Sequence, residues 1–389
     1  AKTTGPEFEN KRAAMRKADG WPEYRTESDT TLFNEPLITG GEGATYYSSY
    51  TPETTFRALD GIGFPWLNFG RTIGSMDNVV TDAILSIGAR VKEGPSSGGK
   101  PPALTTERTP VPPLVTVHPD TSAVTTAPAN TVWARQEAAL GRRVYDVPQP
   151  TVTGDPKSVT RNPSGTWTVK PPADGAGPKS KVVFSGQCTP GSQIMWYAPR
   201  VSAKATSSDG VSAEGFGSTD GWGQAGILTL GTVPASGEVR VDVTASEAGE
   251  ITQSPIGCLD LRRFADTTAE LTKNGAVKVS TGGHSLNAVL PSGSRGYAVV
   301  ATTAVDGWTC TVDGRTAKPV GRNGFLAVPL GAGGTNVACD FTPPGMVKGA
   351  AVSGVGIAGI LVGGLVVPWV RRRYDRRQVS VTVPQATGR

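Results

Sequence analysis

The feature that most constrains this chain is an uninterrupted apolar segment close to its C-terminus. Residues 349–370 read GAAVSGVGIAGILVGGLVVPWV and contain no charged side chain. A helix needs about 20 apolar residues to cross the hydrocarbon core of a bilayer, so the segment predicts a transmembrane helix rather than a buried core helix. The residues expected at the membrane boundary are Trp369 as an interfacial anchor and the basic stop formed by Arg371, Arg372 and Arg373. Because basic flanks stay cytoplasmic, we expect the tail (371–389) inside and the preceding residues outside the cell membrane.

The net charge of the chain is concentrated in that tail. Residues 371–389 hold six arginines and one aspartate, which equals the formal net charge of +5 of the whole chain. The remaining residues carry equal numbers of basic and acidic side chains, so the basic excess is a membrane signal and predicts no nucleic-acid partner. Membrane lipid is the expected partner of this end of the chain.

The apolar segment also contains a GxxxG pair, Gly359 and Gly363. Small residues let helix backbones approach closely in lipid, where packing drives association. One interpretation is that the helix packs against other membrane helices. The other is that a chain with 50 glycines places some here by chance.

The chain before the membrane segment predicts mainly β structure with some α, arranged as tandem β-sandwich or jelly-roll-like modules outside the membrane. Short alternating apolar runs separated by Gly, Pro and Ser recur after residue 181 and are typical of sandwiches. Helical patterns occur at 73–91, after Asn130 as a candidate N-cap, and at 259–274 with Asp260 as cap and Gly275 as terminator.

The expected division of the chain follows from these patterns and from its Pro-rich stretches. The expected segments are a mixed α/β part (1–146), a Pro-rich linker (147–180), a β-sandwich (181–263), a helix with a second β module (264–346), the transmembrane helix (349–370) and the basic tail (371–389). Within the first segment, residues 93–129 are expected to form an extended linker with one strand near residues 115–117.

The four cysteines show no CxxC or Cys/His spacing, which predicts no metal site. An even number in an exported segment favours disulfides, and four cysteines allow three pairings. We favour Cys188–Cys258, because these residues end the first and begin the last strand of the sandwich. We favour Cys310–Cys339, because both lie in strands of one compact unit and Asp313-Gly314 predicts a hairpin after Cys310.

Aromatic residues on polar loops are the candidate ligand contacts. Phe216 and Trp222 lie in the polar glycine loop 207–224, and Tyr46 and Tyr47 lie beside Ser48 and Ser49. Such rings can stack on a sugar, which predicts carbohydrate binding. The alternatives are that Trp222 caps the sandwich and that the tyrosines are packed loop residues.

Catalytic groups are not apparent in the sequence. No nucleophile motif, phosphate loop or metal cluster occurs, and we assign no catalytic residue. The carboxylates of Asp60, Asp77 and Asp82 are scattered along the chain, so solvated or capping roles are expected for them. His118 has no second histidine or cysteine near it and is expected to be a surface residue. His284 follows Gly282 and Gly283 at a turn, and nothing near it in the sequence completes a metal or catalytic set.

The start of the chain carries a further expectation. The sequence begins at Ala1 with no apolar segment near its start. An exported segment needs a signal peptide or an upstream membrane helix, so we expect the chain to be part of a longer protein or a processed form of one.

The C-terminal block resembles the end of the YfhO family of bacterial multi-pass membrane proteins, which are related to GT-C glycosyltransferases. The matching residues are Asp306-Gly307-Trp308, Val312-Asp313-Gly314, Gly324-Phe325, Val328-Pro329, Gly333 and Pro343-Pro344-Gly345, followed by the membrane segment and its arginines. Upstream, YYSSY and SMDNVVTDAILSIGARV resemble the tyrosine–serine segment and a helix of the family, although Ala89-Arg90 replaces the usual Lys-Tyr. The Cys188–Cys258 sandwich looks like the actinobacterial type.

The resemblance implies a function for the whole protein. It would be a GT-C-type glycosyltransferase that uses a lipid-linked sugar donor, with or without a divalent cation, to modify a cell-envelope glycopolymer. This chain would be its outer region and last membrane helix, holding the acceptor glycan next to upstream membrane helices of the same protein. No cofactor and no catalytic residue are assigned to this chain. The alternative is a single-pass, non-catalytic envelope protein whose sandwiches bind carbohydrate or a protein partner.

Overall fold

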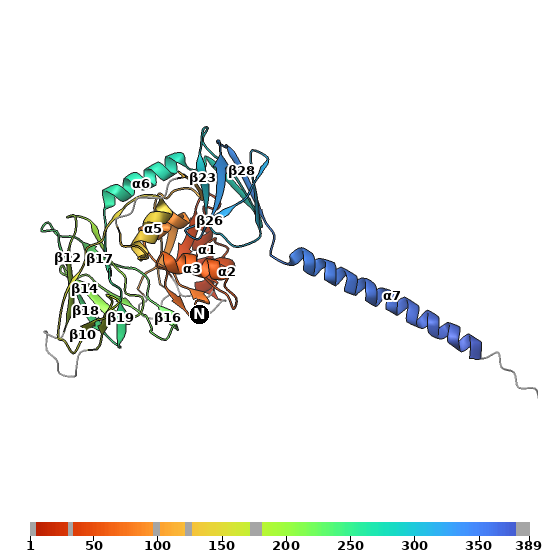
Figure 1. Cartoon of the computed structure of the whole chain (residues 1–389), viewed down its shortest axis with the longest axis horizontal. Helices are drawn as coiled ribbons and strands as arrows, with labels where there is room; N and C mark the ends of the chain where they lie inside the picture. The colour runs from red at the N-terminus through yellow and green to blue at the C-terminus, as the bar shows by residue number, and fades with distance from the viewer. Residues whose placement is uncertain (1–4, 30–33, 96–101, 121–126, 172–180, 379–389) are drawn as a thin grey trace, which may run out of the picture. The chain divides into compact units, whose positions relative to one another are not determined.

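The chain forms two compact units, residues 1–340 and 341–389, in a computed structural model. The structure describes residues 5–29, 34–95, 102–120, 127–171 and 181–378, without the side chains of residues 35–36 and 375–378. The first unit is mainly β, with mostly antiparallel sheets and helices packed among them (Figure 1). The second contains a long apolar helix. The predicted fold class is confirmed.

The first sandwich is built from two antiparallel sheets that enclose one apolar core. One sheet has the order β15(Ser212–Gly215), β14(Ala203–Ser207), β18(Glu238–Ala245), β12(Val182–Gln187), β9(Thr151–Thr153). The other has the order β17(Leu228–Thr232), β13(Gln193–Trp196), β20(Ile256–Leu259), β8(Tyr145–Asp146). Alternate residues of β18 are buried, as expected for strands with one face on the core and one in solvent. A small sheet, β10(Val159–Arg161), β11(Trp167–Val169), β19(Gly249–Ile251), closes one end.

The second sandwich follows the same principle. One sheet has the order β21(Lys278–Gly282), β22(Ser285–Val289), β28(Asn336–Phe341), β24(Trp308–Val312), β25(Arg315–Ala317). The facing sheet has the order β26(Val320–Arg322), β27(Phe325–Gly331), β23(Gly296–Thr303), β7(Val115–His118). Strand β7 confirms the strand expected near residues 115–117. The segment predicted as a linker also supplies β6(Leu104–Arg108), which sequence reasoning missed because its residues are polar and lie at a sheet edge.

Both favoured disulfides are present. Cys188–Cys258 joins the chain just after β12 to β20 and so connects the two sheets of the first sandwich, with a Cα–Cα distance of 6.2 Å. Cys310–Cys339 joins neighbouring strands β24 and β28 within one sheet of the second sandwich, with a Cα–Cα distance of 4.1 Å. Each bond therefore fixes a contact inside its own sandwich.

The N-terminal part contains a mixed sheet and helix α1(Pro6–Ala18). Strand β5(Ile87–Glu93) is central, parallel to β1(Arg25–Ser28) and antiparallel to β6. The predicted helix over 73–91 is too long: α4 covers Val79–Leu85, and Ser86 ends it in a left-handed conformation with φ 57°. The rest of the pattern is β5, whose first five residues are all buried. A short strand that is buried on both faces has a continuous apolar sequence, and periodicity alone cannot distinguish such a run from a buried helix.

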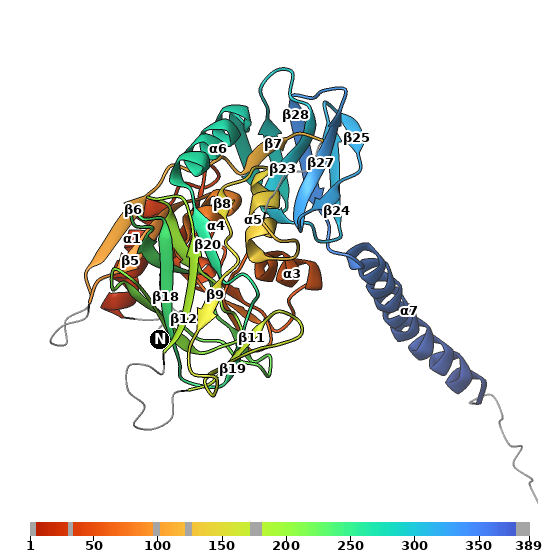
Figure 2. The same cartoon turned by 60° about the vertical axis from the view of Figure 1, so that its left-hand side comes forward.

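Three helices and a short sheet connect these parts through a central core. The helices are α3(Glu53–Gly61), α4 and α5(Val132–Leu140), and the sheet has the order β16(Gly223–Gln224), β3(Trp66–Leu67), β4(Thr72–Ile73), β2(Tyr46–Tyr47). Trp133 of α5 is fully buried, contacts Tyr145 and Tyr197, and donates to the Ser254 carbonyl at 2.8 Å. Figures 1 and 2 both show α5 between the strands of the two sandwiches.

The helix caps follow the sequence closely. Helix α6 covers Leu261–Asn274, and the Asp260 carboxylate accepts the amides of Arg262 and Arg263 at 3.0 Å, so the predicted cap and the Gly275 terminator are confirmed. At α5 the prediction was off by one residue. Thr131 is the N-cap, with its hydroxyl accepting the Ala134 amide at 3.2 Å, while Asn130 has a left-handed backbone. The remaining short helix is α2(Glu35–Thr39).

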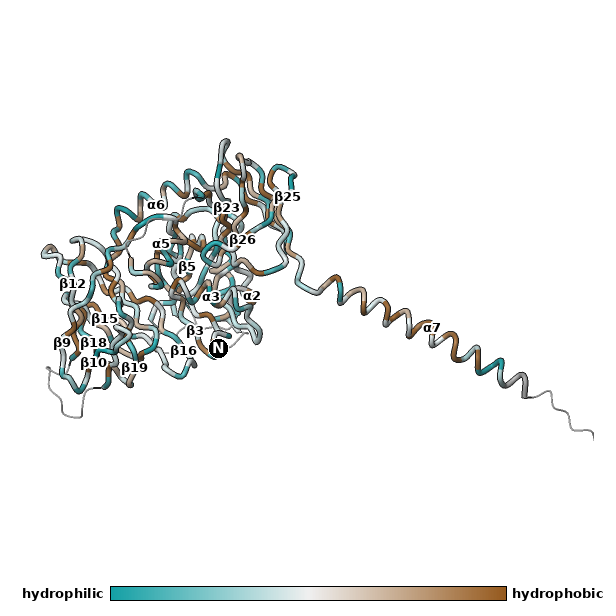
Figure 3. The backbone as a smooth tube through the Cα atoms, viewed as in Figure 1, coloured by the Kyte–Doolittle hydropathy of each residue, from teal (hydrophilic) through white to brown (hydrophobic). Residues whose placement is uncertain are grey.

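The second unit is dominated by helix α7(Met346–Gln378). Residues 346–374 are long and apolar enough to cross a membrane, with mean hydropathy 2.2 over the apolar window, and the apolar colour runs along this helix in Figure 3. Trp369, Arg371, Arg372 and Arg373 lie on its exposed surface, and the Arg373 guanidinium stacks over the Trp369 ring at 4.1 Å. Residues 379–389 of the predicted tail lie outside the described residues, and its cytoplasmic side stays a prediction.

Candidate functional site

The short four-stranded sheet brings the predicted aromatic residues into one region. Tyr46 and Tyr47 form β2 at one edge, and Trp222 directly precedes β16 at the other edge. Strand β16 pairs with β3 through Gly223 and Leu67, so a loop of the first sandwich is joined to the N-terminal part. Residues more than 150 positions apart in the sequence therefore meet along four short strands.

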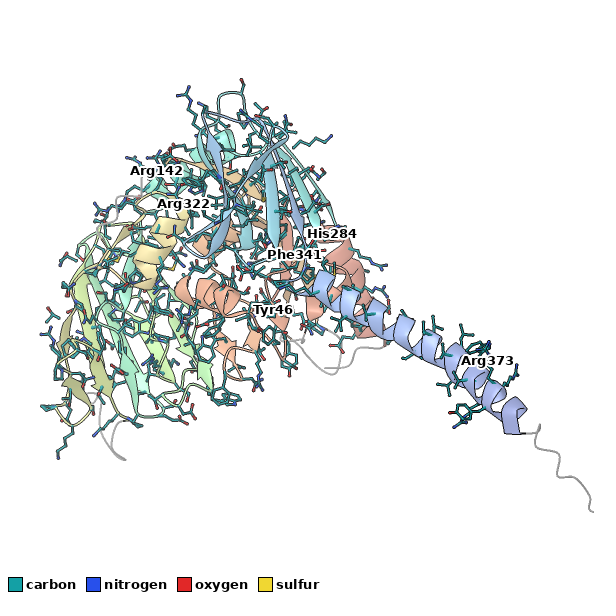
Figure 4. The ribbon with its side chains drawn as sticks, turned by 45° about the vertical axis from the view of Figure 1, so that its right-hand side comes forward. Tyr46, Arg142, His284, Arg322, Phe341 and Arg373 are labelled. Atoms are coloured by element: carbon teal, nitrogen blue, oxygen red, sulfur yellow. A yellow bond between two sulfur atoms is a disulfide. The ribbon has the colours of Figure 1, made fainter. Side chains whose placement is uncertain are left out.

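A groove of about 740 Å³ runs beside this sheet, within the size range of ligand sites. It is lined by Pro65, Trp66, Leu67, Thr72, Gly74, Ser75, Met76, Asp77, Glu214, Gly215, Phe216, Trp222, Gln224, Ala225, Gly226, Ile227, Leu228 and Thr229. Two of the four predicted contacts, Phe216 and Trp222, line the groove. Tyr46 and Tyr47 do not: Tyr46 (Figure 4) packs against the central core, and Tyr47 lies at the sheet edge.

Phe216 and Trp222 form an exposed aromatic pair. Their ring centroids are 5.6 Å apart and nearly perpendicular, and the side chains remain 51% and 41% exposed. Neither ring belongs to the core of the first sandwich. The interpretation of Trp222 as a cap of that sandwich therefore does not hold, since the ring packs on Phe216 at the groove instead.

The loop that carries this pair is held in place by its own residues. The Asp220 carboxylate accepts hydrogen bonds from the Ser218 hydroxyl and from the Trp222 amide at 2.9 Å, and these bonds hold the pKa of Asp220 below its usual range. A side chain at Gly217 would lie 2.2 Å from the Pro199 carbonyl oxygen, so only glycine permits this close approach. The rings are thus positioned before any ligand arrives.

A further exposed aromatic residue, Phe69, lies at the tip of the β3–β4 hairpin. Asn68 and Phe69 both have left-handed backbones, with φ 55° and 57°, and the Phe69 amide donates to the Trp222 carbonyl at 3.4 Å. A bulky residue with positive φ is strained, and such strain gathers at functional sites. The Phe69 ring is 67% exposed. Sequence reasoning missed it, although the aromatic density of the stretch FPWLNFG was a usable signal.

The carboxylates beside the groove are organised by Arg90, whose side chain is buried. Its guanidinium donates to the Asp82 carboxylate, to the Met76 carbonyl at 2.8 Å and to the Ser75 hydroxyl at 3.3 Å. Asp77 lies 3.6 Å from Arg90 and pairs with Lys92 at 2.6 Å. The expectation of a scattered, solvated carboxylate was wrong for Asp82, which is buried against Arg90 because α4 and β5 fold back on each other. Asp77 stays exposed to solvent, as expected, while it pairs with Lys92.

The groove therefore combines an aromatic wall with a polar rim. The indole of Trp66 is the third aromatic ring in the groove wall, after Phe216 and Trp222. It lies edge-to-face with Phe56 at a centroid distance of 5.4 Å, and its Nε1 donates to the Asp60 carboxylate at 3.0 Å. Glu214, exposed on edge strand β15, and Asp77 supply carboxylate acceptors at the rim. Among the described residues, no group of three or more His, Cys, Asp or Glu is placed to hold a metal ion.

Comparison with known proteins gives little guidance. No family model matches the chain, and no curated protein matches it. One match among solved structures is the cryo-EM structure of a mutant of the arabinofuranosyltransferase AftD from Mycobacteria, with 12% identity, 55% of this chain and 26% of that chain covered, and a TM-score of 0.19. A TM-score of this size does not establish a common fold. The YfhO resemblance stays a prediction.

The class of protein follows from the chain itself. An apolar helix of spanning length and two disulfides indicate a membrane-anchored protein whose β-rich region lies outside the cytoplasm. The groove beside the short sheet is the candidate site of that outer region.

Proposed function

We propose that the outer region binds a cell-envelope glycan in the groove beside the short sheet. The observation that carries this proposal is the exposed Phe216–Trp222 pair, which lies on a hydrogen-bonded loop and lines a groove together with the carboxylates of Asp77 and Glu214. A sugar ring presents C–H groups on its faces and hydroxyls around its edge. Aromatic rings can stack on the C–H faces, and carboxylates can accept hydrogen bonds from the hydroxyls.

For the whole protein, we propose the glycosyltransferase role that the YfhO resemblance implies. The groove would hold the acceptor glycan, and upstream membrane helices would carry the lipid-linked sugar donor and the chemistry. The residues of this chain then bind and orient the acceptor, and none of them is assigned a catalytic step. The apolar helix α7 and the aromatic groove support this arrangement.

The second candidate is a single-pass envelope protein that binds carbohydrate or a protein partner without catalysis. The same groove favours it equally, because binding needs no upstream bundle. The two candidates differ in the length of the native polypeptide, because only the glycosyltransferase needs an upstream bundle of membrane helices.

Glycan binding is tested with the full chain in nanodiscs on an array of arabinan, galactan, mannan and glucan fragments. We expect at least one fragment class to bind, and Trp222→Ala to weaken it by about tenfold, which equals about 1.4 kcal/mol. Tyr50→Ala is the matched control, since this ring is 82% exposed but does not line the groove. Equal binding by Trp222→Ala and the wild type, with unchanged thermal stability, would refute the groove as the site.

A further inference from the structure

A second cleft of about 510 Å³ lies next to the groove and differs from it in chemistry. Its walls come from the end of α3, the start of α5, the β10–β11 hairpin and the segments that follow β13 and β19. The lining is rich in hydroxyl, amide and charged groups, which include Asp60, Arg200 and Glu250, with hydroxyls from Thr166 and Thr252. None of these residues was predicted from the sequence to contact a ligand.

The groove and the cleft share one lining residue, Gln224. Its amide donates to the Tyr197 hydroxyl at 3.1 Å and to the Phe64 carbonyl at 3.3 Å. Trp66 lines the groove and donates its Nε1 to Asp60, which lines the cleft. Gln224 and the Trp66–Asp60 hydrogen bond therefore link the walls of the two cavities.

One buried group in the cleft wall has no partner. Ser254 is 3% exposed, and its hydroxyl has no hydrogen-bond partner among the described residues, while its carbonyl is taken by Trp133. Buried hydroxyls are normally paired, so such a group calls for an explanation. Because Ser254 lines the cleft, a polar ligand there could supply the missing hydrogen bond.

We propose that the polar cleft is a second sugar subsite, so that the site takes an oligosaccharide of at least two residues rather than a single sugar. This inference rests on glycan binding in the groove. The cleft presents carboxylate acceptors, a guanidinium donor and hydroxyls that serve as both, with charges of both signs. That mixture matches an uncharged, hydroxyl-rich ring. One sugar stacks on the aromatic wall, and the next lies beyond Gln224 against Arg200 and Glu250.

The test is a titration of the full chain in nanodiscs with arabino-, manno- and cello-oligosaccharides of one to six residues. Calorimetry should give an affinity that rises by at least tenfold between the shortest and longest ligand of the series that binds. Arg200→Gln and Ser254→Ala should abolish that rise and leave the affinity for the shortest ligand unchanged. Arg57→Gln is the matched control, because this arginine is exposed and lines neither the groove nor the cleft.

The variants also separate a failed subsite from a failed site. Trp222→Ala should weaken every ligand length, since it removes the aromatic wall of the groove. If Arg200→Gln and Ser254→Ala bind all lengths like the wild type, the second subsite is wrong and the groove stands. If the wild type binds no probe, or Trp222→Ala has no effect, both proposals fall. Thermal unfolding checks folding, and Ser254→Ala should not lower the melting temperature, because the deleted hydroxyl has no hydrogen-bond partner in the described part of the chain.

Discussion

At the scale of single residues, burial decides the chemistry of His118. Sequence analysis expected a surface residue, but His118 is the last residue of β7 and its side chain is buried, with its Nε2 2.9 Å from the Thr116 hydroxyl. Burial lowers the pKa of His118 to about 4, and the charges of Arg322 and Arg142 (Figure 4) act in the same direction. The expectation was wrong because nothing local in the sequence indicates that β7 pairs with β23 in the second sandwich.

This pKa predicts an acid sensitivity with a definite sign. Between about pH 6.5 and pH 4 the unfolded chain protonates its histidine and the folded chain does not, so stability falls as the pH falls through this window. From pH 7 to pH 5 the wild type should lose about 2 kcal/mol more than His118→Gln. Urea unfolding at both pH values measures this, with exposed His284→Asn as control. Equal losses in the wild type and His118→Gln would contradict the buried neutral state.

Phe69 offers a second prediction at the residue scale. Asparagine accepts a left-handed backbone more readily than phenylalanine, so Phe69→Asn should raise the stability by about 1 kcal/mol. The same change removes an exposed ring beside Trp222 and should weaken glycan binding. Thermal unfolding and array binding measure the two effects. Phe69→Leu keeps the strain but loses the ring, so it should lower binding without raising stability; a stabilised Leu variant would contradict the strain argument.

At the scale of elements, the two disulfides close loops of different length. The paired cysteines are 70 residues apart in the first sandwich and 29 apart in the second. In the chain-entropy model the longer loop stabilises more, by about 4.4 against about 3.6 kcal/mol. Cys188→Ala with Cys258→Ala should therefore lower the unfolding free energy more than Cys310→Ala with Cys339→Ala. Chemical denaturation of both double variants checks the order, and the reverse order would show that local packing outweighs loop closure.

Elements were predicted well where local signals act alone. The cap of α6 follows from Asp260 because a short carboxylate there can reach two amides of the first turn. The extent of α4 was wrong because Ser86 ends the helix in a left-handed turn that no periodicity reveals. Strand β6 was missed because its polar residues at a sheet edge show no alternation.

At the scale of the whole molecule, the proposals differ in the size of the native protein. A glycosyltransferase with the YfhO arrangement carries an upstream membrane bundle, whereas a single-pass binding protein does not. An antibody against the tail QVSVTVPQATGR should therefore detect, in membranes, a polypeptide far above the 40.3 kDa of this chain. A band near 40.3 kDa would overturn the glycosyltransferase proposal and leave the binding protein, whose groove and cleft are unaffected.

The candidate site was predicted only in part. Phe216 and Trp222 were identified because aromatic residues on a polar glycine loop are unusual in any chain. Their partners were not: Trp66, Phe69 and Asp77 come from another part of the sequence, and nothing local indicates that β16 pairs with β3.

The sequence by itself determined the apolar helix, the β-rich class and the cap of α6, because each depends on a pattern within a short stretch of chain. It favoured the observed disulfide pairs through the placement of the cysteines in the predicted strands, although the paired residues are 70 and 29 positions apart. Only the tertiary structure decided that the loop of Trp222 lies beside the β3–β4 hairpin, that Arg90 contacts both Asp77 and Asp82, and that Gln224 lines both a groove and a polar cleft. These contacts join residues far apart in the chain. Such pairings are selected by the burial of the whole core rather than by any local pattern.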